Sequence, residues 1–230
     1  MTEKVIFDMP KNNNTEKQSE APKKRITLAS NVSCEMEEKK SIFIGHAAPV
    51  ADESDARMFI ESKKKEYYDA SHNVFAYILN GGVIARYSDD GEPQGTAGMP
   101  ILNVMKMSGA TDFCVVVTRY FGGILLGAGG LVRAYSSAAK IAVEAAGFSV
   151  YEEYAILRIA VSYSDYQRLT VALAKLGASE DHCDFGESVT VISAVERNRV
   201  SEVSRAVAEI TYGKGNVSFI RYEERAARTK

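Results

Sequence analysis

The sequence has few cysteines and no long apolar run. Its 230 residues include three cysteines, Cys34, Cys114 and Cys183, which stand far apart and form no CxxC pair. This spacing provides neither a zinc-binding pattern nor a disulfide framework, so we expect three buried, reduced thiols. No apolar run approaches the roughly 18–20 residues that cross a bilayer. The polar segment 1–25 lacks the apolar core of a signal peptide, so we expect a disordered tail on a cytoplasmic protein with no membrane partner.

Standard motifs for catalysis and nucleotide binding are also missing. There is no GxSxG sequence, and the three histidines, His46, His72 and His182, lack the HExxH spacing of a zinc site. We therefore expect structural histidines and no metal centre built from them. The net charge is −2 and the isoelectric point is about 6.0. Any contact with nucleic acid must therefore depend on a local basic patch rather than on the charge of the whole molecule.

The hydrophobic period switches repeatedly between the values of strands and helices, which predicts an α+β fold. The pattern divides into two domains, 26–147 and 148–230. The elements expected in the first domain are a strand at 41–50, a helix capped by Asp52, a hairpin turn at Asn80 and Gly81, a buried strand at 112–120 and a helix that Gly147 ends.

The second domain has the element order βαββαβ within about 75 residues, which predicts a ferredoxin-like fold. Its first strand begins near Phe148, and Ser164 and Gln167 fit the capping box of the helix that follows. A second helix and a last strand after Gly215 complete the pattern.

A glycine-rich stretch, FGGILLGAGGLVRAY at residues 121–135, lies between the buried strand and the long helix of the first domain. Its five glycines are Gly122, Gly123, Gly127, Gly129 and Gly130. Free N–H groups at the start of a helix, together with the helix dipole, form a suitable site for an anion such as phosphate. The alternative is that the glycines only allow a tight turn and close packing of the helix.

Charged residues flank this stretch on both sides. Arg119 and Tyr120 stand at the carboxyl end of the buried strand, where ligands of α/β sheets usually bind. Arg133 lies near the start of the following helix, where the dipole disfavours a positive charge. An anionic partner would explain that position, so we select these three residues with the glycines as anion-binding or RNA-binding candidates.

An acidic turn, SDDGEPQG at residues 88–95, carries Asp89, Asp90 and Glu92. These carboxylates could hold Mg²⁺ through oxygen ligands, pair with the arginines, or form an ordinary solvated turn. Opposite charges that are close but unpaired would make a receptive cleft, whereas paired charges would make a structural brace. The sequence leaves both arrangements open.

The motifs YSDDGEPQGTAGMPIL and VVVTRYFGGILLGAGGLVRAYSSA resemble those of the YigZ/IMPACT family, and the resemblance is strongest over about residues 28–147. It implies a first domain like the second domain of ribosomal protein S5 and a second domain like the last domain of elongation factor G. Eukaryotic members of the family restrain a stress-activated kinase and carry an additional N-terminal interaction domain. Only a short polar tail precedes the shared domain here, so we do not extend that pathway to this chain.

The sequence therefore supports three functional hypotheses. The first is a non-enzymatic, translation-associated regulator that binds RNA or the ribosome through a cleft of glycine amides and arginines. The second is an enzyme that acts on a small phosphorylated metabolite with Mg²⁺, because sugar and mevalonate kinases share the broad fold type that the resemblance implies. The third is an adaptor that binds a protein partner through the same two motifs.

Overall fold

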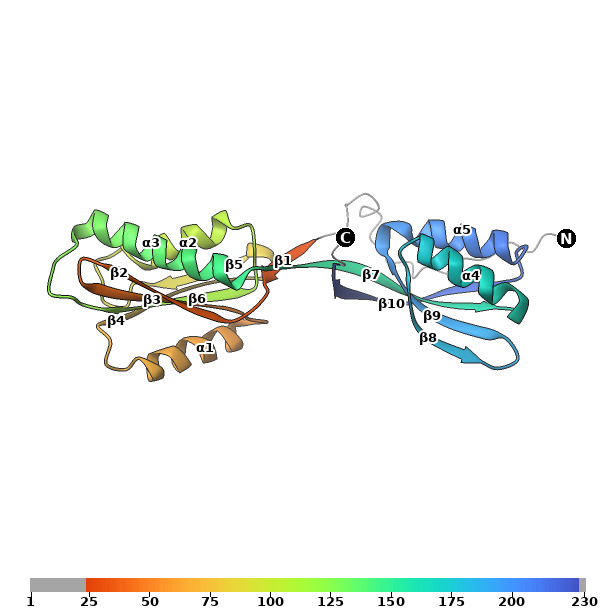
Figure 1. The fold of residues 1–230 in the computed structure, drawn as a ribbon, viewed down its shortest axis with the longest axis horizontal. Coiled ribbons are helices and arrows are strands. Elements are labelled where there is room, and N and C mark those ends of the chain that lie inside the picture. Colours follow the sequence, from red (N-terminus) through yellow and green to blue (C-terminus); the bar gives the residue numbers. More distant parts are fainter. Residues whose placement is uncertain (1–23, 228–230) are drawn as a thin grey trace. The chain divides into compact units, whose positions relative to one another are not determined.

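The computed structural model describes residues 24–227, which form two compact units, Arg25–Val150 and the chain from Tyr151 onward (Figure 1). We describe each unit by itself. The expected tail at 1–25 lies outside the described residues except for its last two.

The N-terminal unit contains a five-stranded sheet in which every neighbouring pair of strands is antiparallel. In their order across the sheet, the strands are β2 (Val32–Glu38), β3 (Ser41–Pro49), β6 (Phe113–Tyr120), β4 (His72–Leu79) and β5 (Ile84–Ser88). The central strand β6 is buried along almost its whole length, as the unbroken apolar run at its centre predicts. A short strand, β1 (Arg25–Leu28), precedes this sheet in the chain.

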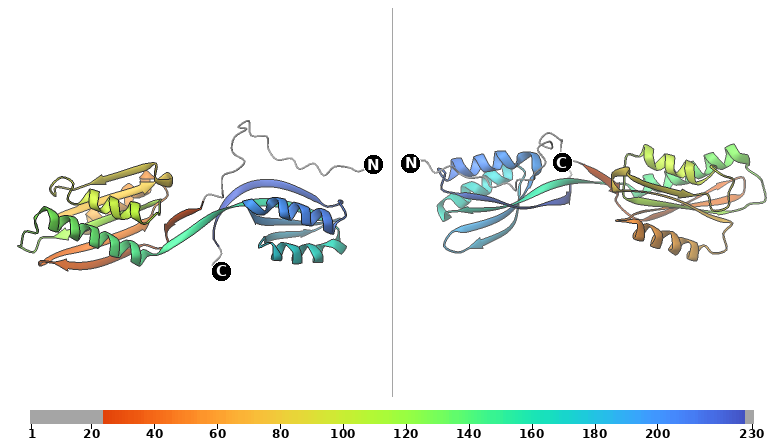
Figure 2. Two further views of the ribbon diagram at one scale, coloured as in Figure 1. Left: turned by 90° about the horizontal axis from the view of Figure 1, so that it is seen from above. Right: turned by 180° about the vertical axis from the view of Figure 1, so that it is seen from behind.

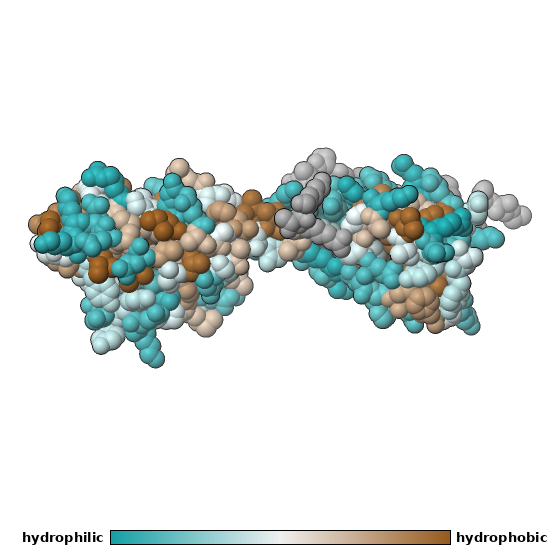
Figure 3. Space-filling view, in the orientation of Figure 1, coloured by the Kyte–Doolittle hydropathy of each residue, from teal (hydrophilic) through white to brown (hydrophobic). Residues whose placement is uncertain are grey.

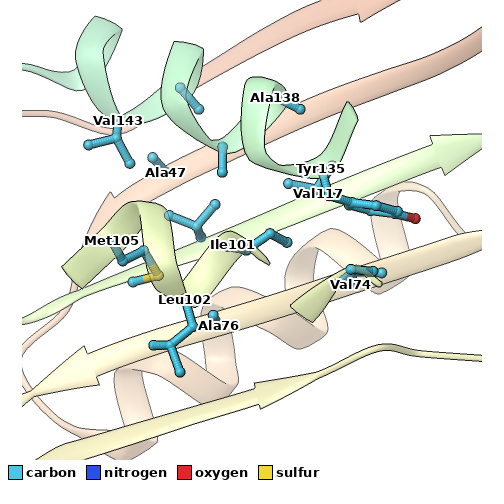
Figure 4. Packing of buried hydrophobic residues seen from close by; sticks show 14 of the residues in the cluster. Ala47, Val74, Ala76, Ile101, Leu102, Met105, Val117, Tyr135, Ala138 and Val143 are labelled. Atoms are coloured by element: carbon cyan, nitrogen blue, oxygen red, sulfur yellow. The ribbon is translucent and has the colours of Figure 1, made fainter. Parts of the chain in front are cut away.

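Helices cover both faces of this sheet (Figure 2). The helix α1 (Glu53–Glu66) lies on one face, and α2 (Gly98–Met107) and α3 (Gly127–Ala146) lie on the other. The larger core lies between the sheet and the α2–α3 pair, where Ile101, Met105 and other apolar side chains interdigitate (Figure 4). The fold therefore directs the carboxyl end of the central strand into α3.

Local sequence signals explain several boundaries of the N-terminal unit. The carboxylate of Asp52 accepts hydrogen bonds from two amides at the start of α1, as expected of an N-cap. A short 3-10 turn at Asn80–Gly82 joins β4 to β5, and both Asn80 and Gly81 have positive φ, which confirms the predicted hairpin. Gly45 allows α3 to approach β3, since a Cβ there would lie 2.5 Å from the carbonyl oxygen of Ala138.

The C-terminal unit confirms the predicted ferredoxin-like order. Its elements are β7 (Phe148–Val161), α4 (Tyr163–Lys175), β8 (Ser179–Phe185), β9 (Val189–Glu196), a 3-10 turn (Arg197–Arg199), α5 (Val200–Ile210) and β10 (Asn216–Ala226). The strands lie in the order β10-β7-β9-β8, with every neighbouring pair antiparallel. Side chains of α4 and α5 pack with one face of the sheet to form the core of this unit.

Two expectations about single residues were wrong. The cap of α4 is Ser162, not Ser164, because the hydroxyl of Ser162 accepts the amide of Asp165 and the helix begins at Tyr163. Of the three cysteines only Cys114 is buried, whereas the other two are partly exposed because their strands lie at the sheet edges. Among residues 24–227, no helix has the length and hydropathy that a transmembrane span needs.

Candidate functional site

The two motifs meet at one end of the N-terminal unit. At this end, β6 finishes at Tyr120, β4 begins at His72 and β5 runs into the acidic turn, while α3 begins at Gly127. Figure 1 draws the β6–α3 loop and the β2–β3 turn at this same end. Segments that are distant along the sequence therefore form one surface.

The charged centre of this end is a buried group of three side chains. Arg119 is only 5% exposed, and its Nη1 donates to Oε1 of Glu92 at 2.6 Å. The hydroxyl of Tyr135 donates to the same oxygen at 2.7 Å, and Figure 4 shows that hydroxyl at the edge of the apolar core. Burial, followed by the hydrogen bond to Glu92, raises the pKa of Tyr135, so its hydroxyl keeps its proton and remains a donor. Arg119 and Glu92 are therefore paired inside the fold, as in a structural brace.

The other two carboxylates of the acidic turn hold backbone amides. Asp89 accepts the amides of Gly95 and Gly98 at 2.9 and 2.8 Å, and so fixes the start of α2. Asp90 accepts the amide of Asn73 at 2.7 Å. The three acidic side chains thus point to different partners, and within residues 24–227 no group of three or more His, Cys, Asp or Glu side chains is arranged to hold a metal ion.

His72, the first residue of β4, also contacts the acidic turn. Its Nδ1 lies 2.8 Å from the carbonyl oxygen of Asp90 and carries the proton, because a carbonyl can only accept. Its Nε2 lies 3.8 Å from Glu92. His72 therefore helps to fix the acidic turn against the sheet, as expected of a structural histidine.

The glycine-rich loop begins with a fixed backbone. The amides of Phe121 and Gly122 donate to the hydroxyls of Ser71 and Ser41, both at 3.2 Å. Gly122 also lies directly against the β2–β3 turn, because an added Cβ would stand 2.0 Å from the carbonyl carbon and oxygen of Lys40. Part of the glycine cluster is thus explained by close approach of two backbones, the structural alternative considered above.

We expect replacement of Gly122 by alanine to lower the free energy of unfolding by about 1–3 kcal/mol, because the new methyl group overpacks rigid backbone. Gly129→Ala is the matched control with the opposite sign. A Cβ on Gly129 would meet only the far end of Arg133 at 3.8 Å, and alanine in a helix gains about 0.5–1 kcal/mol over glycine. Urea unfolding of both variants checks this prediction, and equal stability of the two would contradict it.

The first amides of a helix have no partner within the helix, and at the start of α3 no side chain caps them. Gly127 has a φ of +70° and Gly129 stands in the first turn. Arg133 is exposed, and its guanidinium bends back towards this turn, since Nη1 lies 3.8 Å from the position that a Cβ on Gly129 would occupy. Gly123 also has a positive φ, whereas Gly130 is buried where a Cβ would lie 3.0 Å from that of Leu126.

Two lysines that the sequence analysis missed belong to the same surface. Lys39 and Lys40 form the exposed β2–β3 turn, with Lys40 against Gly122. Within the described part of the chain, neither lysine forms an ion pair, and the same holds for Arg133. The remaining candidate, Tyr120, donates its hydroxyl to Asp69 at 2.7 Å, which raises its pKa to about 12. In the sequence, the only signal for the two missed residues was a pair of consecutive lysines between two strands.

The fold and the two motifs are those of a protein with an Impact N-terminal domain. The sequence pattern of this domain family matches residues 39–143 of the chain. The IMPACT family member YvyE of Bacillus subtilis is 38% identical over 183 residues, which cover 78% of this chain and 83% of YvyE. YigZ of Escherichia coli, also an IMPACT family member, is 33% identical over 202 residues, which cover 85% of this chain and 97% of YigZ. The chain therefore belongs to the IMPACT family.

A solved structure supports the two-domain α+β fold. It is a crystal structure of "an hypothetical protein" with a TM-score of 0.56 and 30% sequence identity, and the similarity covers 86% of this chain and 98% of the other.

Proposed function

We propose that this protein is a cytoplasmic, non-enzymatic regulator of translation that binds structured RNA, free or in the ribosome, through the basic tip of its N-terminal unit. The basic tip consists of Lys39, Lys40, Arg133 and the first turn of α3. The observation that carries the proposal is Arg133, which is exposed, has no ion-pair partner within residues 24–227 and lies over the uncapped start of a long helix.

The electrostatics of this arrangement favour an anion. The amino end of a helix carries roughly half a positive charge, and a cation there is unfavourable by about 0.3–1 kcal/mol. Arg133 adds its full charge at that end, and Lys39 and Lys40 add positive charge on the turn that contacts Gly122, at the start of the loop that leads into α3. A phosphate group would relieve this repulsion and satisfy free amides of the helix. Several neighbouring cations suit the repeated phosphates of a nucleic acid.

Arg119 has a different role in this proposal from the one expected from the sequence. Its guanidinium is buried and neutralised by Glu92, so it supports the surface from beneath and does not contact phosphate. The proposal is thus confined to the exposed cations of the basic tip. The carboxylates of Asp89, Asp90 and Glu92 already accept hydrogen bonds from groups within the fold. They therefore give no support to the alternative of a Mg²⁺-dependent enzyme.

We expect the purified protein to bind a structured RNA with an affinity that falls steeply with salt, because cations that meet phosphates release counterions. Replacing Lys39, Lys40 and Arg133 by alanine should lower the affinity at low salt at least tenfold. The slope of log affinity against log salt should fall by roughly one for each cation that contacts a phosphate. Fluorescence anisotropy at several salt concentrations measures both quantities.

The matched control replaces three exposed cations elsewhere in the unit, Arg57, Arg86 and Lys106, and should leave the slope unchanged. Equal loss in both triple variants would mean that binding depends on overall charge and not on the basic tip. Failure of the wild-type protein to bind RNA or ribosomes at low salt would refute the proposed function. A stoichiometric protein partner that persists after nuclease treatment would instead support an adaptor.

A further inference from the structure

Beside the basic tip, an aromatic ring is exposed on top of a buried cation. The side chain of Phe121 is 49% exposed, and the guanidinium carbon of Arg119 lies 5.5 Å from the centre of its ring. The same guanidinium carbon lies 5.4 Å from the ring centre of the fully buried Phe43. Arg119 thus contacts two aromatic rings, of which Phe43 is buried and Phe121 is half exposed and open to a ligand.

The guanidinium that contacts the two rings is held in place by polar groups of the fold. Arg119 is fixed by Glu92 and approaches Ser41 at 3.5 Å, while its Nε is buried without a hydrogen-bond partner. The guanidinium is therefore held partly by the two aromatic faces. The backbone that carries the ring is also fixed. The hydroxyl of Ser71 accepts a hydrogen bond from the amide of Phe121, and that of Ser41 accepts one from the amide of Gly122. An aromatic ring held in this way loses little conformational entropy when it binds a partner.

The surroundings of the open ring combine aromatic, apolar and basic character. Ile124 and Leu125 are exposed beyond it in the same loop, and the lysines of the basic tip flank it through the contact between Gly122 and Lys40. Figure 3 shows hydrophobic side chains beside hydrophilic ones at the left end of the N-terminal unit. Stacking rings next to cations are what proteins use to bind unpaired nucleotides, since bases stack on the rings and phosphates meet the cations.

We infer that Phe121 is a stacking platform for an unpaired base, so that the protein recognises single-stranded positions such as loops or bulges within structured RNA. This inference rests on the RNA-binding function proposed above and specifies its substrate. The charges favour RNA over an apolar peptide as the occupant, because the residue after Phe121 lies against the turn that carries the exposed Lys39 and Lys40. The lysines contribute affinity for any RNA, while the ring selects RNA with an unpaired base.

The test compares two RNA probes of the same stem sequence: a hairpin with 2-aminopurine in its loop, and a fully paired duplex. The wild-type protein is expected to bind the hairpin more tightly and to quench the 2-aminopurine fluorescence by stacking. Phe121→Leu keeps the apolar bulk but removes the aromatic face, and should lower affinity for the hairpin about tenfold and abolish the quenching. Phe121→Tyr keeps the aromatic face and should retain both. Thermal unfolding checks that both variants are folded.

The outcomes separate this inference from the proposed function. If the wild type binds both probes with a steep salt dependence but Phe121→Leu retains hairpin preference and quenching, the stacking role is refuted and RNA binding stands. If Phe121→Leu keeps the hairpin affinity while Phe121→Ala loses it, the ring acts only as an apolar contact and the inference is also wrong. If the wild type binds neither probe, both the function and the inference fail.

Discussion

Replacing Glu92 with alanine is expected to lower the free energy of unfolding of the N-terminal unit by about 3–5 kcal/mol, because it leaves a buried guanidinium without a counter-charge. Glu92 is 8% exposed and Arg119 5%, so little water reaches the pair. The same oxygen of Glu92 also accepts the hydroxyl of Tyr135, which would lose its partner within the core. Urea unfolding of the full chain, with hydrogen exchange followed in the residues of β6 and α3, measures the loss.

The control for this prediction is an ion pair at the surface. Glu144 lies 3.7 Å from Lys140 on the exposed face of α3, and Glu144→Ala should change stability by less than about 0.5 kcal/mol. The double variant Glu92→Leu with Arg119→Met removes both buried charges, and should recover much of the stability lost in Glu92→Ala. If Glu92→Ala were no less stable than Glu144→Ala, the pair would not be the brace that the geometry indicates.

Where local chemistry determines an element, the sequence predicted the fold well. Asn80 and Gly81 adopt the positive φ angles that make a hairpin turn, and Gly147, with a φ of +65°, ends α3. These signals act over a few residues and need no tertiary context. The cap of α4 was misplaced because Ser162 and Ser164 are both reasonable caps by type, and only the backbone of the folded chain decides between them.

The candidate site was harder to predict because its contacts join distant segments. The sequence indicated that the acidic turn and Arg119 would be close, but not which carboxylate would pair with the arginine. Tyr135 stands at a core position of α3, and only the packing of that helix on the sheet brings its hydroxyl to Glu92. Lys40 reaches the glycine loop through a contact with Gly122, which is 82 positions further along the sequence, so the basic tip could not be deduced.

The division of roles between the buried and exposed cations follows from their positions. Arg119 extends from the central strand into the fold, where Glu92 neutralises it and two aromatic rings contact it. Arg133 extends from the first turns of α3 into solvent and has no counter-charge among the described residues. Replacing Arg119 should therefore change the stability of the protein, whereas replacing Arg133 should change its salt-dependent binding. Variants of the two residues should not be interchangeable.

The second large effect is expected from acid. His46 is fully buried in β3, where burial, followed by the charge of Lys63, lowers its pKa from about 6.5 to about 4. The neutral ring is held by Ser33 at 2.7 Å and by Thr118 at 3.3 Å. Because the pKa is lower in the folded state, the contribution of His46 is fully present above pH 6.5. It is lost progressively as the pH falls from 6.5 towards 4, with a total loss of about 3 kcal/mol.

Replacement of His46 by glutamine should remove this pH dependence while lowering stability at neutral pH. The free energies of unfolding of the wild type and the variant should therefore converge as the pH falls from 6.5 to 4. His182→Gln is the control, since His182 is exposed in β8 and its loss should leave the wild-type profile unchanged. If His46→Gln does not fold, the titration of the His46 ring by NMR in the wild type provides an independent measurement. A midpoint near 6.5 would contradict the prediction, because a ring that titrates normally would not couple folding to protonation.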